Sequence, residues 1–166
     1  DLARRDPLSG LPARAAFMAA AEQLLTSSAN ATVLLLDLVD FKNVNDTHGH
    51  AAGDAVLAAV GARLADWTGT AGLAGRLGGD EYAALVDLSP TDVPEQLLEL
   101  RAALELPVDH DGLTLTVGVS LGAATLIEHP GKGLSALLHA ADLAMYADKG
   151  RGRRGRRQTH QQLVAA

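Results

Sequence analysis

The residues with the clearest capacity for chemistry form one short run, Arg76-Leu77-Gly78-Gly79-Asp80-Glu81-Tyr82. Two adjacent glycines allow unusual backbone angles, and the flanking apolar stretches at 71–77 and 82–88 are predicted strands, so this run is predicted to be a tight hairpin. Paired carboxylates at such a turn are natural ligands for a hard cation. A further acid, Asp37, follows an apolar run and is a candidate partner. Together these acids indicate magnesium-dependent chemistry on a nucleotide.

Hydrophobic periodicity predicts the elements that must position these acids. Apolar residues at helical spacing predict helices at 13–25, 53–67, 93–104 and 134–148. A continuous apolar run predicts a strand at 32–38 that is buried on both faces. Residues 40–50 are predicted to be a polar loop. A second hairpin is predicted to turn at 110–112, between Val108 and residues 121–123.

The order of these elements predicts an α/β (α+β) domain with a central antiparallel sheet flanked by helices. Without its first helix, the chain follows the split βαβ, ferredoxin-like pattern, in which the first and third strands lie side by side at the sheet centre. That arrangement makes the end of the first strand, at Asp37, a neighbour of Asp80 and Glu81. Polymerase palms and nucleotide cyclases share this plan, so the topology alone does not decide the function.

Composition limits the class of protein. The 166 residues fit one domain, and 48% of them are apolar, which argues against disorder. The net charge of −6 argues weakly against a general nucleic-acid binder. The absence of cysteine excludes disulfides and thiolate metal sites, and no apolar run approaches membrane-spanning length. We expect a domain at 1–155, followed by a flexible tail at 156–166. Because the sequence starts without methionine, we also expect it to be excised from a longer protein.

Four motifs resemble those of the GGDEF family, the diguanylate cyclases that condense two GTP into cyclic di-GMP and pyrophosphate. They are Asp6-Pro7-Leu8-Ser9-Gly10-Leu11, Asp37-x-x-x-Phe41-Lys42-x-x-Asn45-Asp46-x-x-Gly49-His50-x-x-Gly53-Asp54, Gly78-Gly79-Asp80-Glu81-Tyr82 and Ala141-Asp142-x-Ala144-Met145-Tyr146-x-x-Lys149-x-x-Gly152-Arg153. One such motif is a weak signal, but four in the right order and spacing are specific. The resemblance implies a cytoplasmic domain of bacterial second-messenger signalling, including where the full-length protein is membrane-anchored.

The resemblance assigns the acids to metal binding and catalysis. Asp37, Asp80 and the main-chain carbonyl of Leu38 would hold Mg²⁺ or Mn²⁺, two ions in each half-site. Glu81, with Asp80, would help to activate the attacking 3′-hydroxyl, which is otherwise a poor nucleophile. The alternative is that these acids are only turn residues on a solvated hairpin.

The resemblance also assigns a GTP site around the loop at 40–54. Asn45 and Asp54 would bind the guanine edge, whose N1–H and amino group suit a carboxylate better than adenine does. Main-chain amides near Phe41 and the Lys42 ammonium would hold phosphates. Two alternative interpretations of this loop do not involve GTP. In the first, it is a polar connection in which Asp54 caps the next helix, and in the second it is a calcium-binding loop. The calcium loop fails because its required glycine and bidentate glutamate positions hold other residues.

Further positions complete the expected site. Gly78 and Gly79 would let the substrate approach the main chain, and Lys149 and Arg153 would face the triphosphate. The simpler explanation for these two cations is a favourable position at a helix C-terminus. The resemblance also pairs Asp6 with Arg76, and this contact is expected to clamp the N-terminal turn onto the hairpin.

Three departures from the family pattern stand out. Tyr82 replaces a phenylalanine, which should do little harm, and Val39 replaces a second aspartate. The inhibitory product site, usually Arg-x-x-Asp upstream of the hairpin, reads Gly69-Thr70-Ala71-Gly72 here. Neither the guanidinium nor the carboxylate is available, so inhibition by product through this site should be absent.

A cyclic product with two-fold symmetry requires two GTP-loaded domains that face each other, so a homodimer, at least transient, is expected. Upstream sensory segments would set the geometry of that dimer. Two rival functions are a non-catalytic GTP- or cyclic-di-GMP-binding regulatory module and a mononucleotide cyclase. The retained acids argue against the first rival, and the set of four motifs argues against the second.

Overall fold

The computed structural model describes the main chain of residues 4–165 and the side chains of residues 4–151. The helices are α1 (Arg14–Ser27), α2 (Phe41–His48), α3 (His50–Thr68), α4 (Val93–Leu104) and α5 (Leu134–Ala165). The strands are β1 (Ala31–Val39), β2 (Leu73–Gly78), β3 (Glu81–Asp87), β4 (Val108–His110), β5 (Leu113–Leu115) and β6 (Gly118–Thr125). No helix of the described main chain is both long enough and apolar enough to span a bilayer.

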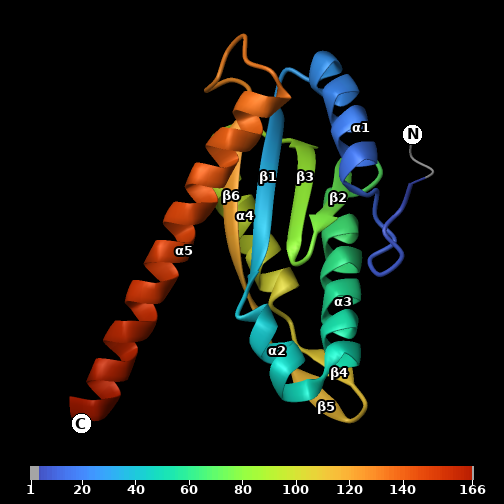
Figure 1. The fold of residues 1–166 in the computed structure, drawn as a ribbon. Coiled ribbons are helices and arrows are strands. Elements are labelled where there is room, and N and C mark those ends of the chain that lie inside the picture. Colours follow the sequence, from blue (N-terminus) through green and yellow to red (C-terminus); the bar gives the residue numbers. More distant parts are fainter. Residues whose placement is uncertain (1–3, 166) are drawn as a thin grey trace.

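Four strands form one antiparallel sheet in the order β2-β3-β1-β6, and β4 pairs with β5 in a separate two-stranded sheet. The predicted split βαβ arrangement is confirmed, because β1 and β3 are neighbours at the centre of the sheet. Figure 1 shows α1 and α5 on one side of this sheet, with α4 on the other. The fold is therefore the expected helix-flanked, palm-like domain.

The alternating side chains of β1 build two separate apolar layers. Leu34 and Leu36 belong to the core shared with α3 and α4, whereas Val33 and Leu35 belong to the core shared with α1 and α5. Burial on both faces explains why this strand is a continuous apolar run, as the sequence predicts. Because side chains alternate along a strand, Asp37 continues the set that faces α1 and α5.

The position of α5 depends on one glycine in the sheet. A Cβ atom at Gly122 of β6 would lie 2.1 Å from the carbonyl oxygen of Ala141 and 2.3 Å from the main-chain nitrogen of Met145. The absent side chain thus lets the α5 main chain rest directly on the sheet. One turn after Met145, the same helix reaches Lys149, whose side chain lies at the end of β1.

Two predictions about the elements are wrong. The expected polar loop at 40–50 contains the short helix α2, which has a single buried residue, Val44, and so little hydrophobic signal. The expected second hairpin does turn at 110–112, but its second strand is not at residues 121–123. Instead, β4 pairs with β5, and β6 lies beside β1 at the edge of the main sheet. The expected helix at 134–148 extends as helix to Ala165.

Candidate active site

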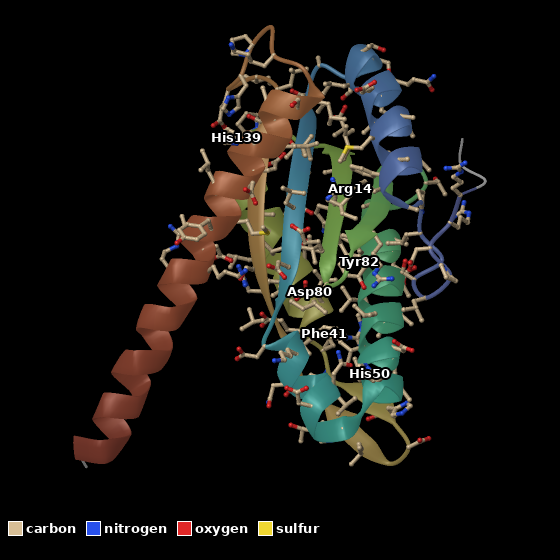
Figure 2. The ribbon with its side chains drawn as sticks, in the orientation of Figure 1. Arg14, Phe41, His50, Asp80, Tyr82 and His139 are labelled. Carbon is tan, nitrogen blue, oxygen red and sulfur yellow. The ribbon has the colours of Figure 1, made fainter. Side chains whose placement is uncertain are left out.

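The hairpin acids and the end of β1 meet as the topology predicts. Glu81 is the register partner of Asp37 across the β1–β3 ladder. Gly78 pairs with Glu81, so Gly79 and Asp80 form the turn, and both glycines have positive φ, 141° and 50°. The Leu38 N–H donates to the Asp80 carbonyl oxygen at 3.3 Å, which ties this turn to β1. Figure 2 shows Asp80 at this end of the sheet.

The two aspartates of the site repel each other. Burial, together with the hydrogen-bonding and negatively charged Asp37 carboxylate beside it, raises the pKa of Asp80 from its ordinary value of 3.8 to about 6. The nearby Lys149 ammonium opposes this rise. A cation between the two carboxylates would remove their repulsion, because each could then remain ionised without facing an uncompensated like charge.

Lys149 supplies positive charge to this cluster from a distant part of the chain. Its Nζ donates to Asp37 Oδ2 at 2.7 Å, and the Lys149 and Asp37 side chains are 35% and 15% exposed. The two residues are 112 positions apart, and only the packing of α5 on β6 and β1 joins them. The structure thus places this predicted triphosphate ligand at the acids.

The oxygen ligands available at this site suit Mg²⁺ better than a metal ion that is coordinated by protein side chains alone. Among the described residues, no group of three or more His, Asp or Glu side chains is arranged to hold a metal. Mg²⁺ keeps several water ligands and typically binds proteins through one or two carboxylates plus substrate phosphates. Asp37 and Asp80 provide such a pair, with main-chain carbonyl oxygens nearby. The residues present therefore fit the implied metal.

A second group of expected site residues gathers where α2 meets α3. Asn45 lies on Gly53: a Cβ at Gly53 would be 1.9 Å from Asn45 Oδ1 and 3.2 Å from the Phe41 ring. Only glycine leaves room for that amide. Asp54 directly follows Gly53 and is exposed, so the two residues expected to bind guanine lie on adjoining elements. Figure 2 shows Phe41 at the same end of the domain as Asp80.

Lys42 is exposed on the first turn of α2. The main-chain amides of Phe41 and Lys42 are among the first four of this helix, which have no carbonyl partner within it. Such amides suit an anion. Arg153 lies outside the residues whose side chains are described.

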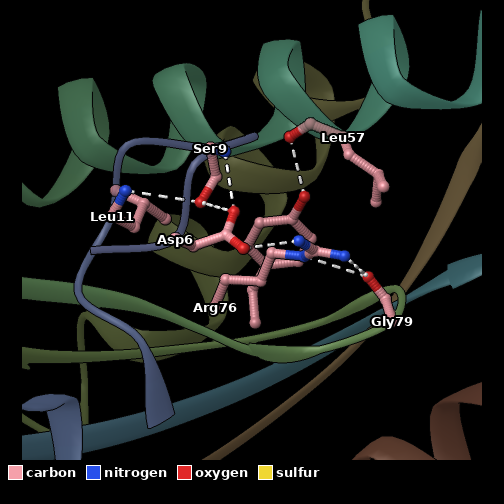
Figure 3. A network of polar contacts seen from close by, with 7 residues as sticks. Asp6, Ser9, Leu11, Leu57, Arg76 and Gly79 are labelled. Carbon is pink, nitrogen blue, oxygen red and sulfur yellow. Dashed lines mark hydrogen bonds and ion pairs between the residues drawn. The ribbon is translucent and has the colours of Figure 1, made fainter. Parts of the chain in front are cut away.

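The expected clamp between the N-terminal turn and the hairpin is present (Figure 3). Arg76 Nη1 donates to Asp6 Oδ1 at 2.7 Å, and its Nε and Nη2 donate to the Gly79 carbonyl oxygen at 3.1 and 2.7 Å. The sequence interpretation missed Ser9, whose N–H and hydroxyl both donate to Asp6 Oδ2, at 2.7 and 2.8 Å. The Asp-x-x-Ser spacing is the signal that could have revealed it.

The hydroxyl of Tyr82 has a buried partner. It donates to the Leu57 carbonyl oxygen of α3 at 2.7 Å, and the ring is fully buried. Burial raises the pKa of Tyr82 well above its usual value, so it stays a neutral donor. The extra hydroxyl relative to the family phenylalanine is therefore satisfied, which agrees with the expectation that this departure does little harm.

The split βαβ sheet, with carboxylates at the end of β1 and in the β2–β3 turn, defines a palm-like nucleotidyl cyclase domain. Residues 3–155 match the family model described as diguanylate cyclase, GGDEF domain, and the chain belongs to this family.

Relatives and solved structures agree with that assignment. The chain is 50% identical to an uncharacterized 19.3 kDa protein of Streptomyces ambofaciens, over 93% of this chain and 83% of that protein. It is 40% identical to diguanylate cyclase DgcN of Escherichia coli, over 89% of this chain but only 37% of DgcN. The GGDEF domain of TpbB from Pseudomonas aeruginosa superposes with a TM-score of 0.82 at 36% identity, covering 89% of each chain. The GGDEF domain of DgcB from Caulobacter crescentus, solved with c-di-GMP, gives 0.83 at 28% identity, covering 90% of this chain and 89% of that one.

Proposed function

We propose that this domain is a diguanylate cyclase that converts two GTP into cyclic di-GMP and two pyrophosphates. The observation that carries the proposal is the intact acid cluster, Asp37, Asp80 and Glu81, brought together at the strand ends with Lys149 beside it. A family member that had lost catalysis would be expected to have lost one of these acids.

In the proposed reaction, the 3′-hydroxyl oxygen of each GTP attacks the α-phosphorus of the other. A new P–O bond forms, the bond to the β-phosphate oxygen breaks, and pyrophosphate leaves. In this proposal, the Glu81 and Asp80 carboxylates take up the hydroxyl proton. Mg²⁺ or Mn²⁺, when bound by Asp37, Asp80 and the Leu38 carbonyl, would supply positive charge for hydroxyl ionisation and for the leaving pyrophosphate.

The remaining site residues bind and orient GTP in this proposal. Asn45, seated on Gly53, and Asp54 contact the guanine edge. Lys42 and the first amides of α2 hold phosphates, and Lys149 exchanges its bond with Asp37 for the triphosphate. Each domain holds one GTP, so two domains face each other in a homodimer for turnover. DgcN and TpbB both extend well beyond the matched region, which agrees with regulation by additional segments in such proteins.

The proposed enzyme lacks product inhibition through the upstream site. Gly69 has φ 64°, and a Cβ at Gly72 would lie 2.8 Å from the Thr68 carbonyl oxygen. The local main chain is thus shaped for glycine at both positions where the family pattern places arginine and aspartate.

A non-catalytic GTP-binding module is the second candidate. Two relatives are named cyclic di-GMP phosphodiesterases, PdeB of Shewanella oneidensis and NbdA of Pseudomonas aeruginosa, and this chain covers 17% and 21% of them. The same domain type therefore occurs in proteins named for the opposite activity.

The test is to incubate the purified domain, free and fused to a dimerising coiled coil, with GTP and Mg²⁺ and to separate the products by chromatography. We expect cyclic di-GMP and pyrophosphate, a loss of at least about hundredfold in Asp80→Ala, and no slowing as product accumulates. Asp66→Ala, which removes an exposed acid near the other end of α3, is the matched control and should retain activity. GTP binding without product in the forced dimer would favour the binding module instead.

A further inference from the structure

The free edge of β6 is occupied by side chains from α5 and from the C-terminal end of α4, including its C-cap residue. β6 is an edge strand, and edge strands present unpaired N–H and C=O groups. Here Glu105 Oε1 accepts the Val119 N–H at 3.0 Å, Arg101 Nη1 donates to the Val119 carbonyl oxygen, and Asp148 Oδ2 accepts the Leu121 N–H at 2.9 Å. Three charged side chains therefore cap one edge of the sheet.

Two of these side chains also join each other. Arg101 Nη2 donates to Asp148 Oδ2 at 2.8 Å, and the two side chains are 31% and 21% exposed. Arg101 belongs to α4 and Asp148 to α5, which cover opposite faces of the sheet (Figure 1). The pair thus closes around the sheet edge and connects the two helical layers at one point.

This connection lies one residue from the candidate active site. Lys149 follows Asp148 on α5, and successive helical residues point about 100° apart. Asp148 therefore points at the edge of β6 while Lys149 points toward β1, where it donates to Asp37 at 2.7 Å. Fixing Asp148 on Leu121 and Arg101 sets both the rotation and the height of this turn of α5.

We propose that Arg101 and Asp148 are positioning residues that hold Lys149 against the acid cluster. A rotation of α5 by one residue would swing the Lys149 side chain about 100° away from Asp37. The contact with Gly122 fixes how closely α5 approaches the sheet, and the edge contacts fix how it is turned. That Lys149 serves a triphosphate rests on the proposed function, whereas its positioning does not.

The chain offers a direct probe of this position, because Lys42, Lys132 and Lys149 are its only lysines. The rate at which an amine-reactive ester acylates each lysine can be followed by mass spectrometry in the ligand-free domain. Lys42 and Lys132 are exposed and serve as internal references. Lys149, at 35% exposure, should react about threefold faster once it is released from its ion pair.

Two substitutions distinguish a change in the position of Lys149 from a change in the electrostatic field at its amine. Asp148→Ala removes a negative charge and Arg101→Met removes a positive charge, so their direct electrostatic effects on the Lys149 amine have opposite signs. We expect both to accelerate Lys149 by about threefold, with Lys42 and Lys132 unchanged. Arg101→Lys should restore protection, and Glu105→Gln, which keeps an acceptor for the β6 edge, should leave Lys149 unchanged.

Faster acylation of Lys149 in Asp148→Ala alone would overturn the inference, because the direct electrostatic effect of the lost carboxylate would explain it. An unchanged acylation rate in both variants would also overturn it. Equal acceleration in Glu105→Gln would also overturn it, because loss of any negative charge at the β6 edge would then suffice. If Asp148→Ala unfolds, Arg101→Met carries the test alone, since faster acylation of Lys149 there is opposite to the direct electrostatic effect of removing a guanidinium. Protection of Lys149 by added GTP tests the proposed function separately: its absence would count against GTP binding and leave the positioning result intact.

Discussion

Breaking the clamp between the N-terminal turn and the hairpin should destabilise the domain measurably. Arg76→Ala removes the ion pair with Asp6 and both hydrogen bonds to the Gly79 carbonyl oxygen. The Arg76 and Asp6 side chains are only 12% and 14% exposed, so solvent cannot fully replace the lost partner. The hairpin turn that carries Asp80 also loses the two hydrogen bonds that the Arg76 side chain of β2 donates to it.

The magnitude follows from what remains after truncation. Removing one partner of a buried ion pair costs about 3–5 kcal/mol. Asp6 keeps both hydrogen bonds from Ser9, so we expect about 2–3 kcal/mol of lost unfolding free energy. In a chain of 166 residues this corresponds to a fall in Tm of roughly 4–12 °C.

Urea unfolding of Arg76→Ala, Asp6→Ala and the double variant at pH 7 isolates the interaction, and we expect a coupling free energy of about 1–2 kcal/mol. Burial opposes ionisation of Asp6, but the Ser9 hydrogen bonds and the Arg76 charge outweigh it and lower the pKa of Asp6. Its contribution is therefore present above the ordinary value of 3.8 and is lost as pH falls through the lower folded-state value. Arg14→Ala, which removes an exposed arginine bonded to the Leu77 carbonyl oxygen, should cost under about 0.5 kcal/mol. Additive costs at pH 7 would refute the clamp.

Three further outcomes are expected. Gly53→Ala should displace the Asn45 side chain and weaken GTP binding, measured by calorimetry, about tenfold or more. The control Gly133→Ala, which has open space at its Cβ, should leave GTP binding unchanged. Equal GTP affinity in both variants would contradict the packing of Asn45 on Gly53. In the metal-free domain the folded-state pKa of Asp80 is about 6 against an ordinary 3.8, so the folded state retains a proton that the unfolded chain releases. Stability relative to Asp80→Asn should therefore fall as pH rises through this window, measured by urea unfolding, and a rise would refute the assignment. Tyr82→Phe should cost about 1 kcal/mol by the same assay, since it removes the buried hydrogen bond from the Tyr82 hydroxyl to the Leu57 carbonyl oxygen of α3, and a neutral result would mean that this bond does not contribute to stability.

Local sequence patterns could predict the central part of the fold because its signals are strong. β1 is a long apolar run, and the glycine pair fixes the β2–β3 turn, so the meeting of Asp37 with Glu81 follows from strand order alone. The signals for α2, β4 and β5 are weak: α2 buries only Val44, and the two small strands are three residues each. The pairing of β6 with β1 joins residues 79 to 93 positions apart, which no local pattern encodes.

The sequence by itself determined which acids form the candidate site and which end of the sheet they occupy, because alternation and turn chemistry act over a few residues. The motif resemblance also pointed to Lys149, but only the tertiary structure decided that this cation bonds Asp37 and how it is held there. Lys149 reaches Asp37 across 112 residues because Gly122 admits the α5 main chain, and because Asp148 and Arg101 lock that helix at the edge of β6. These contacts depend on the packing of whole elements against each other, and that packing is fixed by the complete core rather than by any single segment.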